Sequence, residues 1–293
     1  MSGKGGVGKT TIAVALALLA VKRKRRVILI EMNSTSRVAP LFGKLANKQE
    51  PVVLAPGLTG LNLTPGACFE EFVLKQIRLK ILYNTFFNNS YVRHFVDAIP
   101  GLGELLMLGK IYDIEGSSKS LFSSEPLYDL IIIDAPATGH GLSMLEVPRV
   151  VESVVKVGPM HRSACSMQRL FSDSAKTALC LVTLAEEMPV VETAEFAAAL
   201  KQGAKMSFGP LFINALMPAI PEVNSLASLP DELTIYRHYH ELTRRRASLN
   251  KQYVADIKKR FPDFVRIELP FLFNDLAEPT DFEPLVKAIM GTP

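Results

Sequence analysis

The sequence predicts an α/β fold with a doubly wound, mostly parallel sheet and helical insertions. Short apolar runs such as Val27–Glu31 and Tyr128–Asp134 alternate with longer segments of helical periodicity. Continuous apolar runs are typical of strands that helices bury on both faces. A glycine-rich segment at the start of the chain leads directly into one of the helices. We expect residues 1–293 to form a single domain of this class.

The first eleven residues carry the most specific motif. Gly3–Thr10 fits the phosphate-binding loop pattern of Gly, four residues, and Gly-Lys-Thr, which predicts a P-loop NTPase fold. Glycines let backbone N–H groups point at phosphate oxygens, and the next helix adds its positive dipole end. Lys9 is expected to contact the β- and γ-phosphates of ATP, and Thr10 to bind Mg2+. The expected nucleotide-binding residues of this segment are Gly3, Gly5, Gly6, Val7, Gly8, Lys9, Thr10 and Thr11.

Two strand ends contribute further polar residues. Asn33–Ser36 follows the strand Val27–Glu31, and so is expected at the carboxyl edge of the sheet, where open α/β folds bind ligands. Tyr128–Asp134 is a second strand that ends in an acid. A carboxylate there can hold the Mg2+ shell opposite Lys9, so Thr10 and Asp134 are the predicted metal site. The alternative is that Asp134 only caps a turn.

The remaining elements alternate along the chain. Helical periodicity begins at Cys68, and insertions at about 68–125 and 146–175 are expected to form a helical subdomain, with breaks at Pro100-Gly101 and Gly158-Pro159. Its apolar residues, Phe86 and Leu105 among them, form either core or a groove for an apolar client. The other expected strands are Leu61–Thr64, Thr177–Thr183, Gly209–Asn214 and Phe264–Pro270, and the other helices are Pro189–Lys201 and 231–261.

Composition limits the class of protein. The formal net charge is +4, and its basic clusters, Lys22–Arg26 and Arg244–Arg246, are short enough to be solvated helix faces, so nucleic-acid and membrane binding are not expected. Three isolated cysteines offer no disulfide framework and fit a cytoplasmic protein. Only Met1 and Ser2 precede Gly3. Either the strand that normally leads into a phosphate loop has been lost, or neighbouring elements cover its place.

Four segments together resemble one family: Gly3–Thr11, Asp134–His140, Ala185–Thr193 and Asn214. The chain resembles the arsenite-pump (ArsA) and tail-anchored-protein-targeting ATPases, within the wider MinD and ParA class with a deviant phosphate loop. The resemblance covers nearly the whole chain. It implies ATP or ADP with Mg2+ as cofactors and a homodimer, or a heterodimer with a related ATPase.

The resemblance also assigns roles to residues. Lys4 becomes the signature lysine that reaches the nucleotide of the other subunit in a face-to-face dimer, and within one subunit it has no evident partner. Asp134–His140 becomes the second switch, which reports the γ-phosphate to the helical part. Asn214 is expected to read the adenine edge, and Pro270, Phe271 and Leu272 are expected to border the base.

Two departures from the family pattern matter. Asn33 stands where the family has an aspartate that orients the attacking water. An amide can hold a water but cannot accept its proton, so Asn33 is expected to make hydrolysis slow. In addition, the chain has no Cys-x-x-Cys pair for the zinc clamp of the targeting ATPases, so no zinc clamp is expected.

The sequence therefore predicts an ATP-binding P-loop ATPase, with slow Mg2+-dependent hydrolysis that drives a conformational change of a dimer. The dimer is expected to act on a protein client, which the sequence does not identify. One alternative is a nucleotide-dependent binding or scaffold protein with little or no hydrolysis. Another is a positioning ATPase like ParA or MinD.

Overall fold

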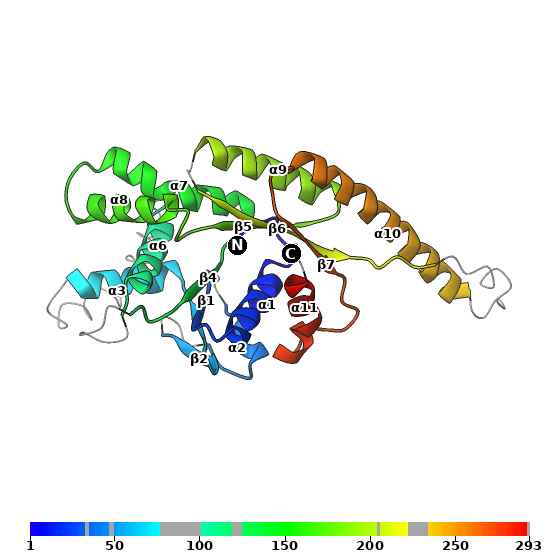
Figure 1. Cartoon of the computed structure of the whole chain (residues 1–293). Coiled ribbons are helices and arrows are strands. Elements are labelled where there is room, and N and C mark those ends of the chain that lie inside the picture. Colours follow the sequence, from blue (N-terminus) through cyan, green and yellow to red (C-terminus); the bar gives the residue numbers. More distant parts are fainter. Residues whose placement is uncertain are drawn as a thin grey trace.

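The computed structural model describes residues 1–32, 35–46, 50–76, 101–118, 125–203, 206–221 and 234–291. Its strands form two sheets, with the orders β2-β3-β1-β4 and β5-β6-β7 (Figure 1). All pairings are parallel except that of β2 with β3, so the described strands are mostly parallel, as expected. The strands are β1 (Val27–Glu31), β2 (Val52–Ala55), β3 (Leu58–Asn62), β4 (Leu130–Asp134), β5 (Leu179–Leu184), β6 (Phe208–Leu216) and β7 (Arg266–Pro270).

Helices cover both faces of the sheets, which confirms the doubly wound α/β fold. Figure 1 shows α1 and α11 on one side and α7 to α10 on the other. The helices are α1 (Lys9–Lys22), α2 (Val38–Leu41), α3 (Pro65–Gln76), α6 (Leu102–Glu115), α7 (Thr138–Val154), α8 (Pro159–Ser172), α9 (Glu187–Gln202), α10 (Thr234–Arg260) and α11 (Glu283–Met290), with the 3-10 helix η3 (Pro279–Phe282) before the last. No helix in the described ranges is both long and apolar enough to cross a membrane.

Strand β1 shows why its sequence is apolar throughout. All five of its residues are buried. Successive side chains of a strand point to opposite faces, so Leu29 packs with α1 and α11, whereas Ile28 and Ile30 pack with the helices on the other side. A strand between two helical layers has no polar face, which explains the continuous apolar run.

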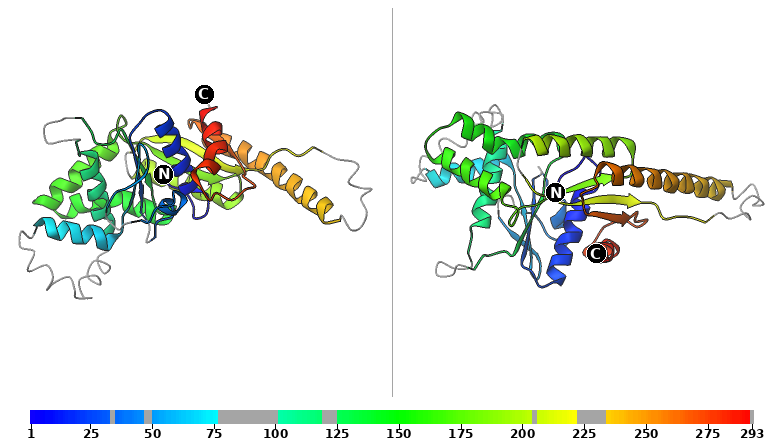
Figure 2. Two further views of the ribbon diagram at one scale, coloured as in Figure 1. Left: turned by 90° about the horizontal axis from the view of Figure 1, so that it is seen from below. Right: turned by 45° about the horizontal axis from the view of Figure 1, so that its top comes forward.

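The first two residues connect the two sheets. The backbone N–H of Ser2 donates to the carbonyl oxygen of Cys180 at 3.0 Å, and the N–H of Val182 donates to Ser2 at 2.9 Å. On the other side, the Met1 amine donates to the carbonyl of Ile133 at 2.7 Å, and Ala135 N–H donates to Met1 at 3.2 Å. Met1 and Ser2 thus lie between β4 and β5, at the position expected for the strand that leads into the loop (Figure 2).

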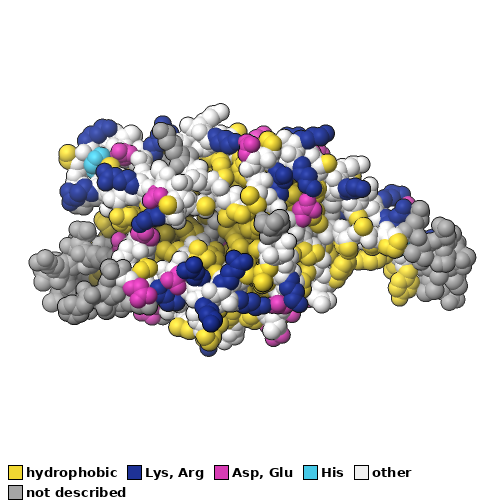
Figure 3. All heavy atoms as spheres, viewed as in Figure 1, with side chains coloured by type: hydrophobic (Ala, Val, Ile, Leu, Met, Phe, Trp, Pro, Cys, Tyr) yellow, Lys and Arg dark blue, Asp and Glu magenta, His cyan; other side chains and the backbone are white. Residues whose placement is uncertain are grey.

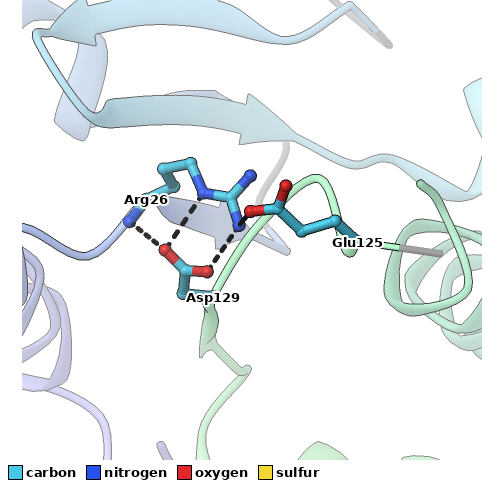
Figure 4. A network of polar contacts seen from close by, with 3 residues as sticks. All are labelled: Arg26, Glu125 and Asp129. Atoms are coloured by element: carbon cyan, nitrogen blue, oxygen red, sulfur yellow. Dashed lines mark hydrogen bonds and ion pairs between the residues drawn. The ribbon is translucent and has the colours of Figure 1, made fainter. Parts of the chain in front are cut away.

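A second connection fixes the starts of β1 and β4. The Arg26 guanidinium contacts both carboxylate oxygens of Asp129, at 3.1 Å from Nε and 2.5 Å from Nη2, and its backbone N–H donates to the same group at 2.8 Å (Figure 4). Glu125 lies 3.4 Å from the guanidinium. These hydrogen bonds hold the pKa of Asp129 well below its usual range.

The boundaries of some elements differ from those expected. The strand expected at Leu61–Thr64 is Leu58–Asn62, and the helical stretch expected from residue 146 begins at Thr138. In α6, Leu105, Met107 and Leu108 are buried in one core cluster with Met144 and Met167, so these residues are core. Phe86 and Phe87, like the rest of residues 77–100, lie outside the described residues.

Candidate nucleotide-binding site

Backbone geometry explains the glycines of the loop. Gly6 and Gly8 have φ angles of +84° and +92°, in the left-handed region that favours glycine. A Cβ atom on Gly8 would also lie 2.2 Å from the Asn214 side-chain nitrogen, and one on Gly3 would lie 2.2 Å from the Val182 carbonyl oxygen. Gly5 has no atom near its ideal Cβ position, so this position faces open space.

Two contacts hold the loop against the sheet. Val7 is buried and packs in the core around α1, so the middle of the loop is anchored by an apolar side chain. The Asn214 amide, at the end of β6, donates to the Val7 carbonyl at 2.9 Å. In this structure Asn214 therefore tethers the phosphate loop, and its expected contact with adenine stays a prediction.

Lys9 lies at the start of α1 and curls back over the loop. Its Nζ donates to the carbonyl oxygens of Gly3 at 3.1 Å and Lys4 at 2.9 Å. Burial lowers the pKa of the ammonium, while the nearby Asp134 carboxylate acts in the opposite direction. A half-buried cation at a helix N-terminus forms a compact positive site, suited to an anion such as a phosphate group.

Thr10 and Asp134 bring two oxygen-bearing side chains together, of the kind that bind Mg2+. The Thr10 hydroxyl donates to Asp134 Oδ2 at 2.5 Å. Asp134 is 2% exposed, and its other oxygen, Oδ1, is buried with no hydrogen-bond partner in the described ranges. Burial raises the pKa of this carboxyl group. The Thr10 hydrogen bond and the positive charges of the Met1 amine and Lys9 lower the same pKa, but by less. An orphaned carboxylate oxygen beside a hydroxyl fits a Mg2+ ion, which prefers oxygen ligands.

Lys4 has a partner within its own subunit, contrary to the sequence argument. Its Nζ lies 2.7 Å from Glu192 Oε1, with the two side chains about one-third exposed at 33% and 30%. Glu192 lies on α9, within the segment 185–193 that contributed to the family resemblance. The sequence argument missed this pair because the two residues lie 188 positions apart.

The same loop contacts the segment after Asp134. The backbone N–H of Thr138, the first residue of α7, donates to the Gly3 carbonyl at 3.1 Å. Asp134 ends β4, and α7 packs against α8. This hydrogen bond joins the loop directly to the helices on that side of the sheet.

The expected border of the base lies at the end of β7. Pro270 pairs with Leu216 at the end of β6, and Phe271 N–H donates to the Leu216 carbonyl at 2.8 Å. The Arg246 guanidinium lies 5.9 Å from the centre of the Phe271 ring. Of the other expected site residues, Leu272 packs against the α1 core and Thr11 lies in the first turn of α1, whereas Asn33 is outside the described residues.

Sequence reasoning missed Glu31, a buried carboxylate at the same sheet edge. Glu31 pairs with Asp134 in the register of β1 and β4, and it is 3% exposed. It accepts hydrogen bonds from the Ser36 hydroxyl at 2.5 Å and from the backbone N–H groups of Arg37 at 2.7 Å and Val38 at 3.2 Å. The sequence did carry a signal for this residue, because Glu31 is an acid at the end of an otherwise apolar strand. Glu31 thus fixes the backbone of residues 36–38.

A phosphate loop on a doubly wound sheet, with a lysine, a threonine and a strand-end aspartate around it, defines a P-loop ATPase. The family model for anion-transporting ATPases (ArsA) matches residues 1–165, and the chain belongs to this family. ATPase BagA of Mycobacterium tuberculosis is 33% identical over 233 residues, which cover 78% of this chain and 67% of the relative.

Two other relatives extend the comparison. A putative arsenical pump-driving ATPase of Aquifex aeolicus is 23% identical over 318 residues and covers 97% of both chains. The ATPase get3 of Schizosaccharomyces japonicus is 29% identical over 158 residues, covering 53% of this chain and 45% of the relative. These relatives, and the family, make the chain an ATP-binding ATPase.

Proposed function

We propose that this chain is a Mg2+-dependent ATPase that works as a homodimer, and that ATP hydrolysis changes the dimer's conformation and so acts on a protein partner. Residues 1–293 form one ATPase domain in this proposal, with the helical part at about 68–125 and 146–175. The observation that carries it is the convergence of Lys9, Thr10 and Asp134 at one edge of the sheet, with one carboxylate oxygen that has no hydrogen-bond partner among the described residues.

Each residue has a role in this proposal. The loop N–H groups and Lys9 bind the phosphates, and Thr10 and Asp134 hold Mg2+. When bound, Mg2+ neutralises charge on the phosphates. Glu31 fixes the backbone of Arg37 and Val38, and Asn33 holds the attacking water. Asn214, Pro270, Phe271 and Leu272 border the adenine.

The route from nucleotide to partner starts at the loop. Thr138 at the start of α7 donates to Gly3, so a shift of the loop on hydrolysis would reposition α7 and the helix packed on it. Lys4 is held by Glu192 within one subunit, and both groups are partly exposed, so Lys4 can leave this ion pair for the partner's nucleotide. The ArsA and get3 relatives, which are named as ATPases, support the reaction but leave the client open.

The test removes the central cation. Lys9→Ala should weaken ATP binding roughly tenfold to a hundredfold or more, because a charge-assisted hydrogen bond contributes about 1.5–3 kcal/mol. Isothermal titration calorimetry measures the affinity. Lys22→Ala is the matched control, since Lys22 ends the same helix and pairs with Glu283 far from the loop. Equal ATP affinity of the Lys9→Ala variant and the wild type would overturn the assignment.

A turnover assay separates the proposal from its alternative. A binding or scaffold protein would hold ATP without releasing phosphate, whereas the proposed ATPase releases phosphate in a Mg2+-dependent way. Phosphate release that persists with chelator, or in the Lys9→Ala variant, would point to a contaminating enzyme.

A further inference from the structure

A cavity of about 430 Å³ lies between α7, α8 and α9, at the edge of the sheet opposite the phosphate loop. Its walls come from the second half of α7 and the last residues of α8 and α9, and Met206 lines it just before β6 begins. Strand β6 then runs from Phe208 to Asn214 beside the loop, which at about 3.3 Å per residue is a distance of roughly 20 Å. The cavity is therefore separate from the candidate nucleotide-binding site, and its volume is typical of small-molecule pockets.

One wall of the cavity is apolar. Phe171, near the end of α8, is only 9% exposed and belongs to the core cluster on this side of the sheet. Leu145 and Met206 also line the cavity, are half-buried and pack against the same cluster. An aromatic ring and a thioether make favourable contacts with a further ring or a long aliphatic chain. This wall therefore suits the apolar part of a ligand.

The rest of the cavity carries two acids and two cations, whose charges cancel. None of the four forms an ion pair with a residue in the described ranges; they are Glu146, Arg149, Glu152 and Lys201. The Lys201 ammonium instead lies 5.9 Å from the centre of the Phe264 ring. Where α7 and α8 lie in Figure 3, Lys and Arg side chains are interspersed with Asp and Glu side chains. Balanced charges fit neither a polyanion nor a polycation, and favour a ligand with one charge of each sign.

Glu146 and Arg149 lie one turn apart on α7 and meet at Gly203, just after the end of α9. The Arg149 Nη1 donates to the Gly203 carbonyl oxygen at 3.0 Å, and a Cβ atom on Gly203 would lie 2.6 Å from Glu146 Oε1. Opposite charges at this spacing can pair with each other. Here the guanidinium turns to the carbonyl, and the carboxylate has no hydrogen-bond partner in the part of the chain that the structure describes. Glu146 can therefore accept from a ligand, and Arg149 keeps most of its N–H groups for one.

We propose that the cavity binds an α-amino acid with a large apolar side chain. The ligand's ammonium pairs with Glu146, its carboxylate pairs with Arg149, and its side chain packs against Phe171 and Met206. In an α-amino acid both charged groups are attached to one carbon, which matches two side chains that meet at one glycine. Helices α8 and α9 both end at the cavity, so their partial negative charges also favour the ammonium. This site goes beyond the proposed ATPase function and does not depend on it.

The experiment compares L-phenylalanine with two analogues that each lack one charge. Phenethylamine lacks the carboxylate, and 3-phenylpropionate lacks the ammonium. Each compound is titrated into the full-length chain without nucleotide, and saturation-transfer NMR measures its affinity. We expect L-phenylalanine to bind, and each analogue to bind roughly tenfold more weakly or worse, because each analogue loses one charge-assisted contact.

Three variants assign the two charges to their partners. Glu146→Gln should weaken binding of L-phenylalanine and phenethylamine roughly tenfold and leave 3-phenylpropionate unchanged, whereas Arg149→Gln should weaken 3-phenylpropionate and leave phenethylamine unchanged. Gly203→Ala should act like Glu146→Gln, because the new Cβ displaces the carboxylate, while the backbone φ of −99° suits alanine. Glu195→Gln, an exposed acid of α9 that does not line the cavity, is the control. Thermal denaturation checks that each variant folds.

Several outcomes would overturn the amino-acid site. One is that L-phenylalanine does not bind to the wild type, and another is that the three compounds bind equally well. A third is that a folded Glu146→Gln variant loses affinity for both analogues alike, since the carboxylate would then not receive the ammonium. Lys9→Ala should keep the affinity for L-phenylalanine, and its loss there would place the ligand in the phosphate loop instead of the cavity. In each case ATP binding by the wild type is a separate measurement, so the proposed function can stand without this site.

Discussion

At the scale of residues, Glu31 is a buried acid on which the backbone after β1 depends. The carboxylate accepts three hydrogen bonds from the segment 36–38. Arg37 and Val38 N–H both donate to Oε1, and the Ser36 hydroxyl donates to Oε2. Glu31→Gln would replace one of these acceptors by an NH2 group that cannot accept and would remove the charge from the other, so the free energy of unfolding should fall by about 1–3 kcal/mol. Urea denaturation measures this change. Glu195→Gln, an exposed acid on α9, is the control, and equal losses in the two variants would contradict the role of Glu31.

Asn33 sets the expected rate of the reaction. If an aspartate has been replaced here, Asn33→Asp should raise turnover and leave ATP affinity nearly unchanged, because the group acts on water rather than on nucleotide. A positioned base contributes on the order of 10²–10⁴ in rate, and a transplanted one should recover less. Phosphate release measured from mild acid to neutral pH tests this, with Asn33→Ala as the control. No gain at any pH would indicate that another group activates the water.

At the scale of elements, the link between β1 and β4 makes stability depend on acid. The lowered pKa of Asp129 means that its contribution is fully present above the unfolded-state pKa of about 3.9, and is lost as the pH falls below that value. The Asp129→Asn variant should therefore be less stable at neutral pH and lose less on acidification. Thermal denaturation against pH measures both. Glu125→Gln should change the profile less, since Glu125 makes a single 3.4 Å contact with Arg26.

The sequence predicts the elements whose pattern is local. The phosphate loop, the buried strand β1 and the acid that ends β4 each follow from a few adjacent residues. In the structure Lys9, Thr10 and Asp134 lie close together, and their binding of nucleotide and metal stays a prediction. The loop glycines that need special geometry, Gly6 and Gly8, were also identified by the motif alone.

Contacts between segments that are far apart in the sequence could not be predicted from patterns of adjacent residues. Lys4 and Glu192 are brought together by the order of β4 and β5 around the first two residues, and no local pattern encodes that order. The start of α7 at Thr138 was missed because residues 134–140 were assigned to the second switch and the helix was expected only from about residue 146.

At the scale of the whole molecule, the proposed dimer gives Lys4 a second possible partner, the nucleotide of the other subunit. Lys4→Ala should keep most ATP binding per subunit, yet lose ATP-induced dimer tightening and hydrolysis. Glu192→Gln should act in the opposite direction, because it releases Lys4 from its ion pair. The gain in dimer affinity should be up to about fivefold, since a partly exposed ion pair contributes about 0–1 kcal/mol.

Sedimentation with a non-hydrolysable ATP analogue and Mg2+ compares these variants with the wild type. If wild type and Lys4→Ala associate identically, Lys4 does not reach the partner's nucleotide. If Glu192→Gln weakens the dimer, Glu192 contributes to the interface itself rather than restraining Lys4.

The position of Met1 and Ser2 between β4 and β5 has a consequence for the cooperativity of unfolding. The N–H of Ala135 donates to Met1 and the N–H of Val182 donates to Ser2, so these two residues join the two sheets, and neither sheet can open here without exposing the edge of the other. The amide hydrogens of Ala135 and Val182 should therefore show similar protection in native-state hydrogen exchange, and clearly unequal protection would show that the two sheets open separately.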